Sequence, residues 1–499
     1  MKMKQTKILK FFTVLISTSF LCAPTFGDAP TCKKEAHEKP CDPCKKEDQT
    51  PVTLQETLER TYMQNATLDA ARAGLRATDE NVSIANADWR PSLSVQGTQS
   101  FAQNYNASPT SRQHTNSTGY VARIDQNIYN GGGTDANIEK QENLVFSAKA
   151  GLFSTEQTVL FNAVQAHADV IANQDIVKFR QDSVSFYKKF LEQAEARYEV
   201  GAIGRTDVEA ARAEYEGAKG DLSVAIGQLE GAKATYYQIV ASSPENLTQP
   251  NILLELPRTY EEALDVACTN NPKITEARFA LEAAEYNVDL QISELLPDLG
   301  IQGTVGNNRT TGTGNESHPK QTALTASATL NVPVYLQGKP SAQIRQAYQQ
   351  VAQQKVSLVQ TQREVEQATK TAWENHIAAR ESLKRYMAAV KAGELAVEGA
   401  TAEADVGAKS VVEVLVIQRD LVQTQIDLVG AQETLVTTTY AVLQAMGSLM
   451  ASTLKLNVRY YDPDCYYNEY KDAWIQFWQS EDWRYVRNEP CGPICPGPR

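Results

Sequence analysis

Hydrophobic and polar residues follow two different periods along this chain, and the same order of periods occurs twice. Helical spacing predicts one helix over about 53–88 and another over about 259–294, each ending before a proline, Pro91 or Pro297. A period of two then predicts a β-hairpin over 92–130 and a second over 298–336. Long helices over 134–198 and 340–404 follow, each with a shorter helix that returns alongside it.

The second half of the pattern repeats the first at a constant shift of 206 residues, as from Thr53 to Thr259. A unit this long is not a short solenoid repeat, so we interpret it as one helix–hairpin–helix module used twice. The modules span 52–248 and 257–450 and are joined by a proline-containing segment. Residues that recur at this shift include Thr53, Leu58, Asn65, Arg72, Pro91, Gly97 and Gly201, which return as Thr259, Leu264, Asn271, Arg278, Pro297, Gly303 and Gly407.

Each predicted strand places its apolar side chains on one face and its polar side chains on the other. Segments of roughly 10 to 13 residues with this alternation are typical of outer-membrane β-strands, although two half-buried hairpins of a soluble protein would explain it equally well. The loops at 106–117 and 308–320 are polar. The apolar set comprises Leu93, Val95, Phe101 and Tyr105; Tyr120, Ala122, Ile124 and Ile128; Leu299, Ile301 and Val305; and Leu324, Ala326, Ala328, Leu330 and Val332.

The long helices predict antiparallel coiled coils. Apolar residues of the returning helices are spaced alternately three and four apart, from Val208 to Ile239 and from Val414 to Ala445. Any antiparallel coiled coil explains this seam, but it does not explain the hairpins. Four membrane strands cannot close a barrel alone, and an open edge in lipid leaves backbone groups unpaired. Several chains would therefore share one barrel, and their helices would extend its wall as a tube.

The first 27 residues predict a cleaved secretory signal. Lys2, Lys4, Lys7 and Lys10 precede an apolar run, and small residues lie before Asp28. No later segment has the roughly 18 apolar residues that a membrane helix needs. Loss of the four lysines changes the formal net charge from −12 to about −16, which argues against a nucleic-acid partner. Residues 28–51 form a charged, irregular head, and 451–499 form a tail rich in tyrosine and tryptophan.

Cysteines cluster at the two ends of the mature chain. In an oxidising periplasm such clusters predict disulfides. The Cys41-x2-Cys44 and Cys491-x3-Cys495 pairs could instead bind zinc, although the sequence around them matches no metal module. Cys268 stands alone, and Cys22 would leave with the signal. The disulfide candidates are Cys32, Cys41, Cys44, Cys465, Cys491 and Cys495.

Several segments in a fixed order resemble the TolC family of outer-membrane efflux proteins over about 52–450. They are residues 88–93 and 294–299 before the first strand of each hairpin, 332–338 after the second hairpin, and the helix turns at 197–208 and 405–410. The resemblance implies a homotrimer with a twelve-stranded β-barrel, four strands per chain, continued by an α-helical periplasmic tunnel. It also implies docking to an inner-membrane ABC or proton-driven pump through a periplasmic adaptor protein, in type I secretion or tripartite efflux.

The resemblance further implies a gate at the periplasmic tips of the helix pairs. A tyrosine that better-known members carry near this gate is Ala404 here, and the second of two inward acids is Val416. The implied gate residues are Thr206, Asp207, Lys409 and Glu413, with Thr206 and Asp207 latched against Lys409. The implied adaptor-contacting turns comprise Val200, Gly201, Ala202, Ile203, Val406, Gly407, Ala408 and Ser410.

The sequence carries no catalytic motif. Its five histidines lie near no candidate nucleophile, and it has no phosphate-binding glycine loop. This argues against an enzyme. The hairpins and the family resemblance lead us to expect a channel-tunnel without a cofactor, in the outer membrane of a Gram-negative cell with a periplasmic extension, that exports small molecules, proteins or both. The alternative is a structural periplasmic coiled-coil rod or adhesin, which the hairpins disfavour.

Overall fold

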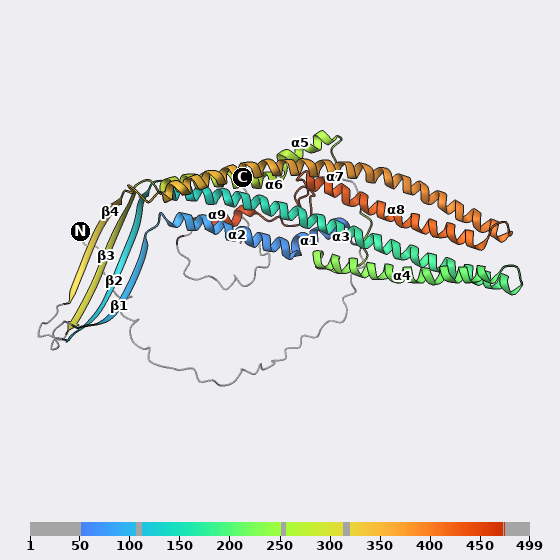
Figure 1. Ribbon diagram of the computed structural model, residues 1–499, viewed down its shortest axis with the longest axis horizontal. Coiled ribbons are helices and arrows are strands. Elements are labelled where there is room, and N and C mark those ends of the chain that lie inside the picture. The colour runs from blue at the N-terminus through green and yellow to red at the C-terminus, as the bar shows by residue number, and fades with distance from the viewer. Residues whose placement is uncertain (1–50, 106–111, 251–255, 313–319, 473, 475–499) are drawn as a thin grey trace, which may run out of the picture. The chain divides into compact units, whose positions relative to one another are not determined.

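The structure is a computed structural model that describes residues 51–105, 112–250, 256–312, 320–472 and 474. The first module contains α1 (Leu54–Gln64), α2 (Ala66–Ala87), β1 (Ser92–Tyr105), β2 (Arg112–Asn130), α3 (Gly133–Glu199) and α4 (Arg205–Val240). The second contains α5 (Tyr260–Asn270), α6 (Pro272–Ser293), β3 (Asp298–Gly312), β4 (Gln321–Asn331), α7 (Lys339–Asp405) and α8 (Val411–Ala445), and α9 (Pro463–Tyr470) follows (Figure 1). The order of helices and hairpins predicted from the periods is confirmed.

The two predicted helices at the module starts are wrong as single helices, because each is divided at an asparagine. Asn65 and Asn271 adopt extended backbone (φ −74°, ψ 120° and φ −67°, ψ 122°), ending α1 and α5. The Asn65 Oδ1 then accepts from the backbone N–H groups of Thr67 and Leu68, which caps α2. At the second break Pro272 follows directly and disfavours helical backbone at Asn271. A helical period continues across such a break, so it did not reveal it.

The four strands form one antiparallel sheet in the order β1-β2-β3-β4 (Figure 1). Its register places the predicted apolar residues of all strands on one face, as in the row Val95, Ala122, Val305 and Leu324. The predicted parity is therefore confirmed, except for Val332, which lies beyond the end of β4, and near the end of β2. A bulge there leaves Ile128 without a position in the ladder and sets Tyr129 opposite Leu299.

The long helices pack in pairs, α3 against α4 and α7 against α8, and α3 also contacts α2, α6 and α8 (Figure 1). One apolar cluster joins α1, α2, α3 and α8 to the chain after α8, with Leu160 and Leu449 fully buried. Burial of such side chains stabilises the fold by roughly 1.5–3 kcal/mol each. No described helix combines the length and the apolar character that crossing a membrane requires.

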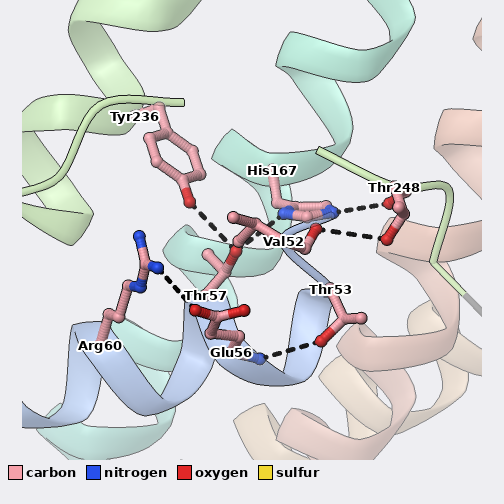
Figure 2. Close-up of polar contacts among 8 residues, drawn as sticks. All are labelled: Val52, Thr53, Glu56, Thr57, Arg60, His167, Tyr236 and Thr248. Carbon is pink, nitrogen blue, oxygen red and sulfur yellow. Dashed lines mark hydrogen bonds and ion pairs between the residues drawn. The ribbon is translucent and has the colours of Figure 1, made fainter. Parts of the chain in front are cut away.

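A buried polar cluster joins α1, α3 and α4 to the segment that connects the modules (Figure 2). The Oγ1 of Thr57 lies 2.9 Å from Nδ1 of His167 and 3.1 Å from the hydroxyl of Tyr236. The Nε2 of His167 lies 3.1 Å from the carbonyl oxygen of Thr248. Because a carbonyl only accepts, Nε2 carries the hydrogen, Nδ1 accepts from Thr57, and Tyr236 donates to Thr57.

This polar cluster fixes the start of the first module as well. The backbone N–H of Thr248 donates to the carbonyl of Val52 at 3.0 Å, and Val52 N donates to Asn246 O at 3.0 Å. His167 is fully buried, and burial lowers its pKa below the usual value of 6.5. His167 is therefore neutral at pH 7, in agreement with its hydrogen bonds.

Most of the predicted disulfide candidates fall outside the described residues. Cys32, Cys41, Cys44, Cys491 and Cys495 lie there, as do the signal at 1–27 and nearly all of the head at 28–51. Cys465 lies on α9, half-buried. The disulfides stay a prediction.

Candidate functional site

The two turns at the tips of the helix pairs have the same backbone design. Gly201 (φ +74°) and Gly407 (φ +77°) adopt left-handed backbone directly after Val200 and Val406. In the first turn Ala202 N donates to Arg197 O at 2.9 Å and Gly201 N to Tyr198 O at 2.9 Å. The second turn repeats both bonds. These bonds satisfy the last carbonyls of α3 and α7 and require a residue that tolerates positive φ.

The two predicted gate acids occupy equivalent capping positions at the starts of α4 and α8. Asp207 Oδ2 accepts from the backbone N–H of Gly204 at 3.3 Å. Glu413 Oε2 accepts from Ser410 N at 3.1 Å, and Ser410 Oγ accepts from Glu413 N at 3.3 Å, which completes a capping box. Each carboxylate therefore also stabilises the positive end of its helix.

Lys409 lies in the second turn, and its side chain is 29 % exposed. Its Nζ is 3.4 Å from Oε2 of Glu403, which belongs to the same helix pair. Among the described residues of one chain, no ion pair joins Lys409 to Asp207, and Thr206 is exposed. The structure thus brings together Glu403 and Lys409, and Ser410 and Glu413, while the latch between the two turns stays a prediction.

Arg197 is a tip residue that the sequence did not single out. Its Nη1 donates to the carbonyl oxygen of Ala404 at 3.1 Å, so that the end of α3 holds the end of α7. The equivalent residue in the second module, at the shift of 206, is Glu403, which instead faces Lys409. The acceptor of Arg197 is a backbone atom, so no pairing of residue types could have identified it.

The four long helices of the chain meet just behind the tips in one apolar cluster. Ala194, Ala211, Ala404 and Val414 are almost fully buried there. Small side chains allow the helices to approach closely, and Arg419 of α8 reaches to within 3.9 Å of Glu214 on α4. The exposed ends contrast with this core, because Val200 and Val406 are 79 % and 81 % exposed. These two valines are the most prominent apolar groups of the predicted adaptor-contacting turns.

The described residues contain no group of three or more histidine, cysteine, aspartate or glutamate side chains that could hold a metal ion. Among the described residues, the tip contacts include the caps, the Lys409–Glu403 and Arg205–Glu209 ion pairs and the bond from Arg197 to a carbonyl oxygen. Such contacts can hold helix ends in place and can be released at a small cost in free energy.

Comparison with known proteins identifies the family to which this architecture belongs. A family model described as outer membrane efflux protein matches residues 57–242 and 263–448. The outer membrane efflux protein BepC of Brucella suis biovar 1 (strain 1330) is 34% identical over 85% of this chain and 91% of its own length. The outer membrane protein TolC of Escherichia coli (strain K12) is 22% identical over 79% of this chain and 82% of its own length.

Solved structures share the fold. The Campylobacter jejuni CmeC outer membrane channel matches with a TM-score of 0.71 at 14% identity, over 91% of this chain and 98% of that one. The outer membrane protein VceC of Vibrio cholerae matches with a TM-score of 0.66 at 17% identity, over 79% and 96%. The resemblance seen in the sequence is therefore confirmed. The chain belongs to the outer membrane efflux protein family, and it is a channel component of the outer membrane with a periplasmic helical tunnel, not an enzyme.

Proposed function

We propose that three copies of this chain close one twelve-stranded barrel and conduct cargo from the periplasm to the outside. The observation that carries the proposal is the sheet itself, because β1 and β4 are its edges and pair with no further strand among the described residues. Unpaired backbone groups in hydrocarbon cost several kcal/mol each, so these edges need partners. Two copies would give eight strands, but the family resemblance favours three.

The apolar face of the sheet supports the assignment of a lipid-facing side. Val95 and Leu324 are 73 % and 83 % exposed in one chain, as a lipid-facing row would be. Replacing Val95 with Arg should cost roughly 2–4 kcal/mol at mid-membrane and reduce the amount of assembled trimer. Gln96→Arg, one residue away on the other face, is the matched control and should assemble like the parent.

Outer-membrane fractionation followed by electrophoresis of heated and unheated samples measures this assembly, and native mass spectrometry counts the copies. Equal loss for Val95→Arg and Gln96→Arg would exclude a lipid-facing parity. A dimer of the native chain would exclude the twelve-stranded barrel.

We further propose that Thr206, Asp207, Lys409 and Glu413 hold the periplasmic mouth closed through contacts between turns of neighbouring helix pairs. The support is their position at the two matched turns and the exposure of Thr206 and Glu413. If the latch stabilises the closed state by two to three kcal/mol per trimer, its loss shifts the open population roughly 30- to 150-fold. Asp207→Ala combined with Lys409→Ala should therefore admit large antibiotics.

The control for this double variant is Arg205→Ala, because Arg205 lies beside the first turn with a side chain 81% exposed. Minimum inhibitory concentrations of an antibiotic too large for ordinary pores measure the opening. Unchanged concentrations for the double variant, with normal trimer in the membrane, would show that the latch lies elsewhere.

The exposed tip valines support docking of a periplasmic adaptor, and through it an inner-membrane ABC or proton-driven pump. Covering an apolar side chain that is about four-fifths exposed at the end of a coiled coil stabilises the complex with the partner that covers it. Val200→Glu with Val406→Glu should abolish export without loss of trimer, whereas Glu209→Gln, on the exposed side of α4, should leave export unchanged. Export by the double variant at the parental rate would contradict docking through these valines.

A further inference from the structure

The chain after α8 folds back along the first module and is held there by polar contacts. Ala451 N donates to Glu156 Oε1 at 2.8 Å, and Tyr461 N donates to Tyr62 OH at 3.0 Å. The second module separates the two partners of each contact in the sequence, so these contacts do not follow from local conformational preference. The returning segment then continues into α9.

α9 docks on α2 and α3 through several polar contacts, two of which are made by carboxylates of the first module. The Tyr466 hydroxyl donates to Glu80 Oε1 at 2.6 Å, and the Tyr467 hydroxyl donates to Glu142 Oε1 at 3.1 Å. The Ser83 hydroxyl donates to the carbonyl oxygen of Tyr470 at 3.0 Å. No residue of α9 is fully buried. Such an attachment depends on the charge state of its partners.

One buried lysine lies at the centre of this contact. Lys149 on α3 is 8% exposed and forms an ion pair with Asp464, in the first turn of α9. Its Nζ also lies 5.0 Å from the centre of the Tyr467 ring. Asp79 on α2 is 3% exposed, and neither of its carboxyl oxygens has a hydrogen-bond partner among the described residues. A buried carboxylate without a partner is costly, whereas a neutral carboxyl is less so.

The second module shows what the same two positions do without α9. Asp79 and Lys149 correspond, at the shift of 206, to Glu285 and Lys355. Those two residues pair directly at 3.3 Å, with side chains 50% and 59% exposed. The lysine therefore pairs with the acid of the preceding helix where it is uncovered, and with Asp464 where α9 covers it.

We propose that docking of α9 on the first module is coupled to uptake of a proton by Asp79. In the docked form Lys149 pairs with Asp464 and Asp79 is neutral. In the released form Lys149 pairs with the Asp79 carboxylate, as Lys355 pairs with Glu285. α9 thus docks and detaches reversibly, and Lys149 changes its ion-pair partner between Asp464 and Asp79 as it does so.

The charges around Asp79 fix the direction of the effect. Burial raises the pKa of Asp79 from 3.8 to about 6, and Asp464 of α9 and Glu80 of α2 add to the rise. Lys149 of α3 and Arg76 of α2 oppose it, and Tyr467 of α9 stays protonated because its pKa is raised to about 12. A carboxyl with a higher pKa in the docked form binds a proton on docking. Docking is therefore strongest in acid and weakens as the pH rises through about 6.

Hydrogen–deuterium exchange of the α9 amides in the assembled full-length protein tests the proposal, after correction for intrinsic exchange at each pH. In the parent, protection of residues 464–470 should fall on the order of 30-fold between pH 4.5 and 7.5. Asp79→Asn should keep the acid level of protection at pH 7.5. Glu285→Gln, the equivalent change in the second module, should behave like the parent.

Three outcomes decide against the proposal. It is overturned if protection of α9 in the parent does not change with pH, or if Asp79→Asn retains the full pH dependence. If Asp79→Asn does not assemble, Lys149→Gln replaces it, and it should lower α9 protection at every pH. Parental protection in Lys149→Gln would equally overturn the proposal.

Discussion

Thr57, His167 and Tyr236 of the first module correspond, at the shift of 206, to Ala263, Trp373 and Val442 of the second. The first set is a closed hydrogen-bonded cluster, and the second is part of an apolar cluster in which Ala263 and Val442 are fully buried. The helices around both sets are nearly the same, so the fold does not require polar groups here. The polar cluster differs from the apolar one in that it also holds the segment between the modules, because His167 donates to the carbonyl of Thr248 there.

The two chemistries should respond differently to the loss of a hydroxyl. Thr57→Val keeps the shape of the side chain but leaves His167 Nδ1 and the Tyr236 hydroxyl without their shared partner. Because each orphaned buried group costs about 1–3 kcal/mol, the free energy of unfolding should fall by about 3 kcal/mol. Urea unfolding followed by circular dichroism measures it. Thr235→Val, on an exposed face of α4, should change it by no more than about 0.5 kcal/mol. Equal effects of both changes would show that the cluster contributes nothing special.

The reverse exchange in the second module is the next largest effect. Val442→Thr replaces one methyl group by a hydroxyl of about the same size and places it in the apolar cluster. Its best acceptor there is the carbonyl one turn earlier in α8. Burial of a poorly paired hydroxyl should cost about 1–2 kcal/mol in the same unfolding experiment. Stabilisation by Val442→Thr would mean that the second cluster also accepts polar groups, and the comparison would fail.

The smallest expected effect is a pH dependence of stability that His167 gives to the first module and that Trp373 does not give to the second. His167 binds a proton more weakly when folded than when unfolded, because burial lowers its pKa. The unfolded state therefore takes up the proton first, and the contribution of His167 to stability is lost as the pH falls below about 6.5. His167→Gln should lose less of its unfolding free energy than the parent between pH 7 and 5. Trp373→Phe, at the equivalent place, should follow the parental pH dependence; a parental dependence in His167→Gln would contradict the assignment.

The sequence predicted the parts of the molecule that local pattern controls. Strand parity, the long helices and the turns at Gly201 and Gly407 follow from alternation, heptads and the need for positive φ, and the structure has them. The break at Asn65 was missed because an apolar stripe continues across a kink that only a cap reveals.

The contacts that the sequence could not reveal join distant parts of the chain. Arg197 donates to a backbone oxygen on another helix, and the Lys149–Asp464 pair spans most of the chain. The repeat itself was misleading here, because Lys149 and Lys355 occupy equivalent positions but pair with different acids. Internal symmetry predicts equivalent backbones, whereas the segments outside the repeat decide what covers them.

Single-channel recording in planar lipid bilayers tests the central claim most directly. The purified full-length protein should insert as one conducting unit with a small conductance, and Asp207→Ala with Lys409→Ala should raise that conductance several-fold while Arg205→Ala leaves it unchanged. A protein that is assembled in the bilayer but conducts in neither form would contradict a channel that is closed at its tips.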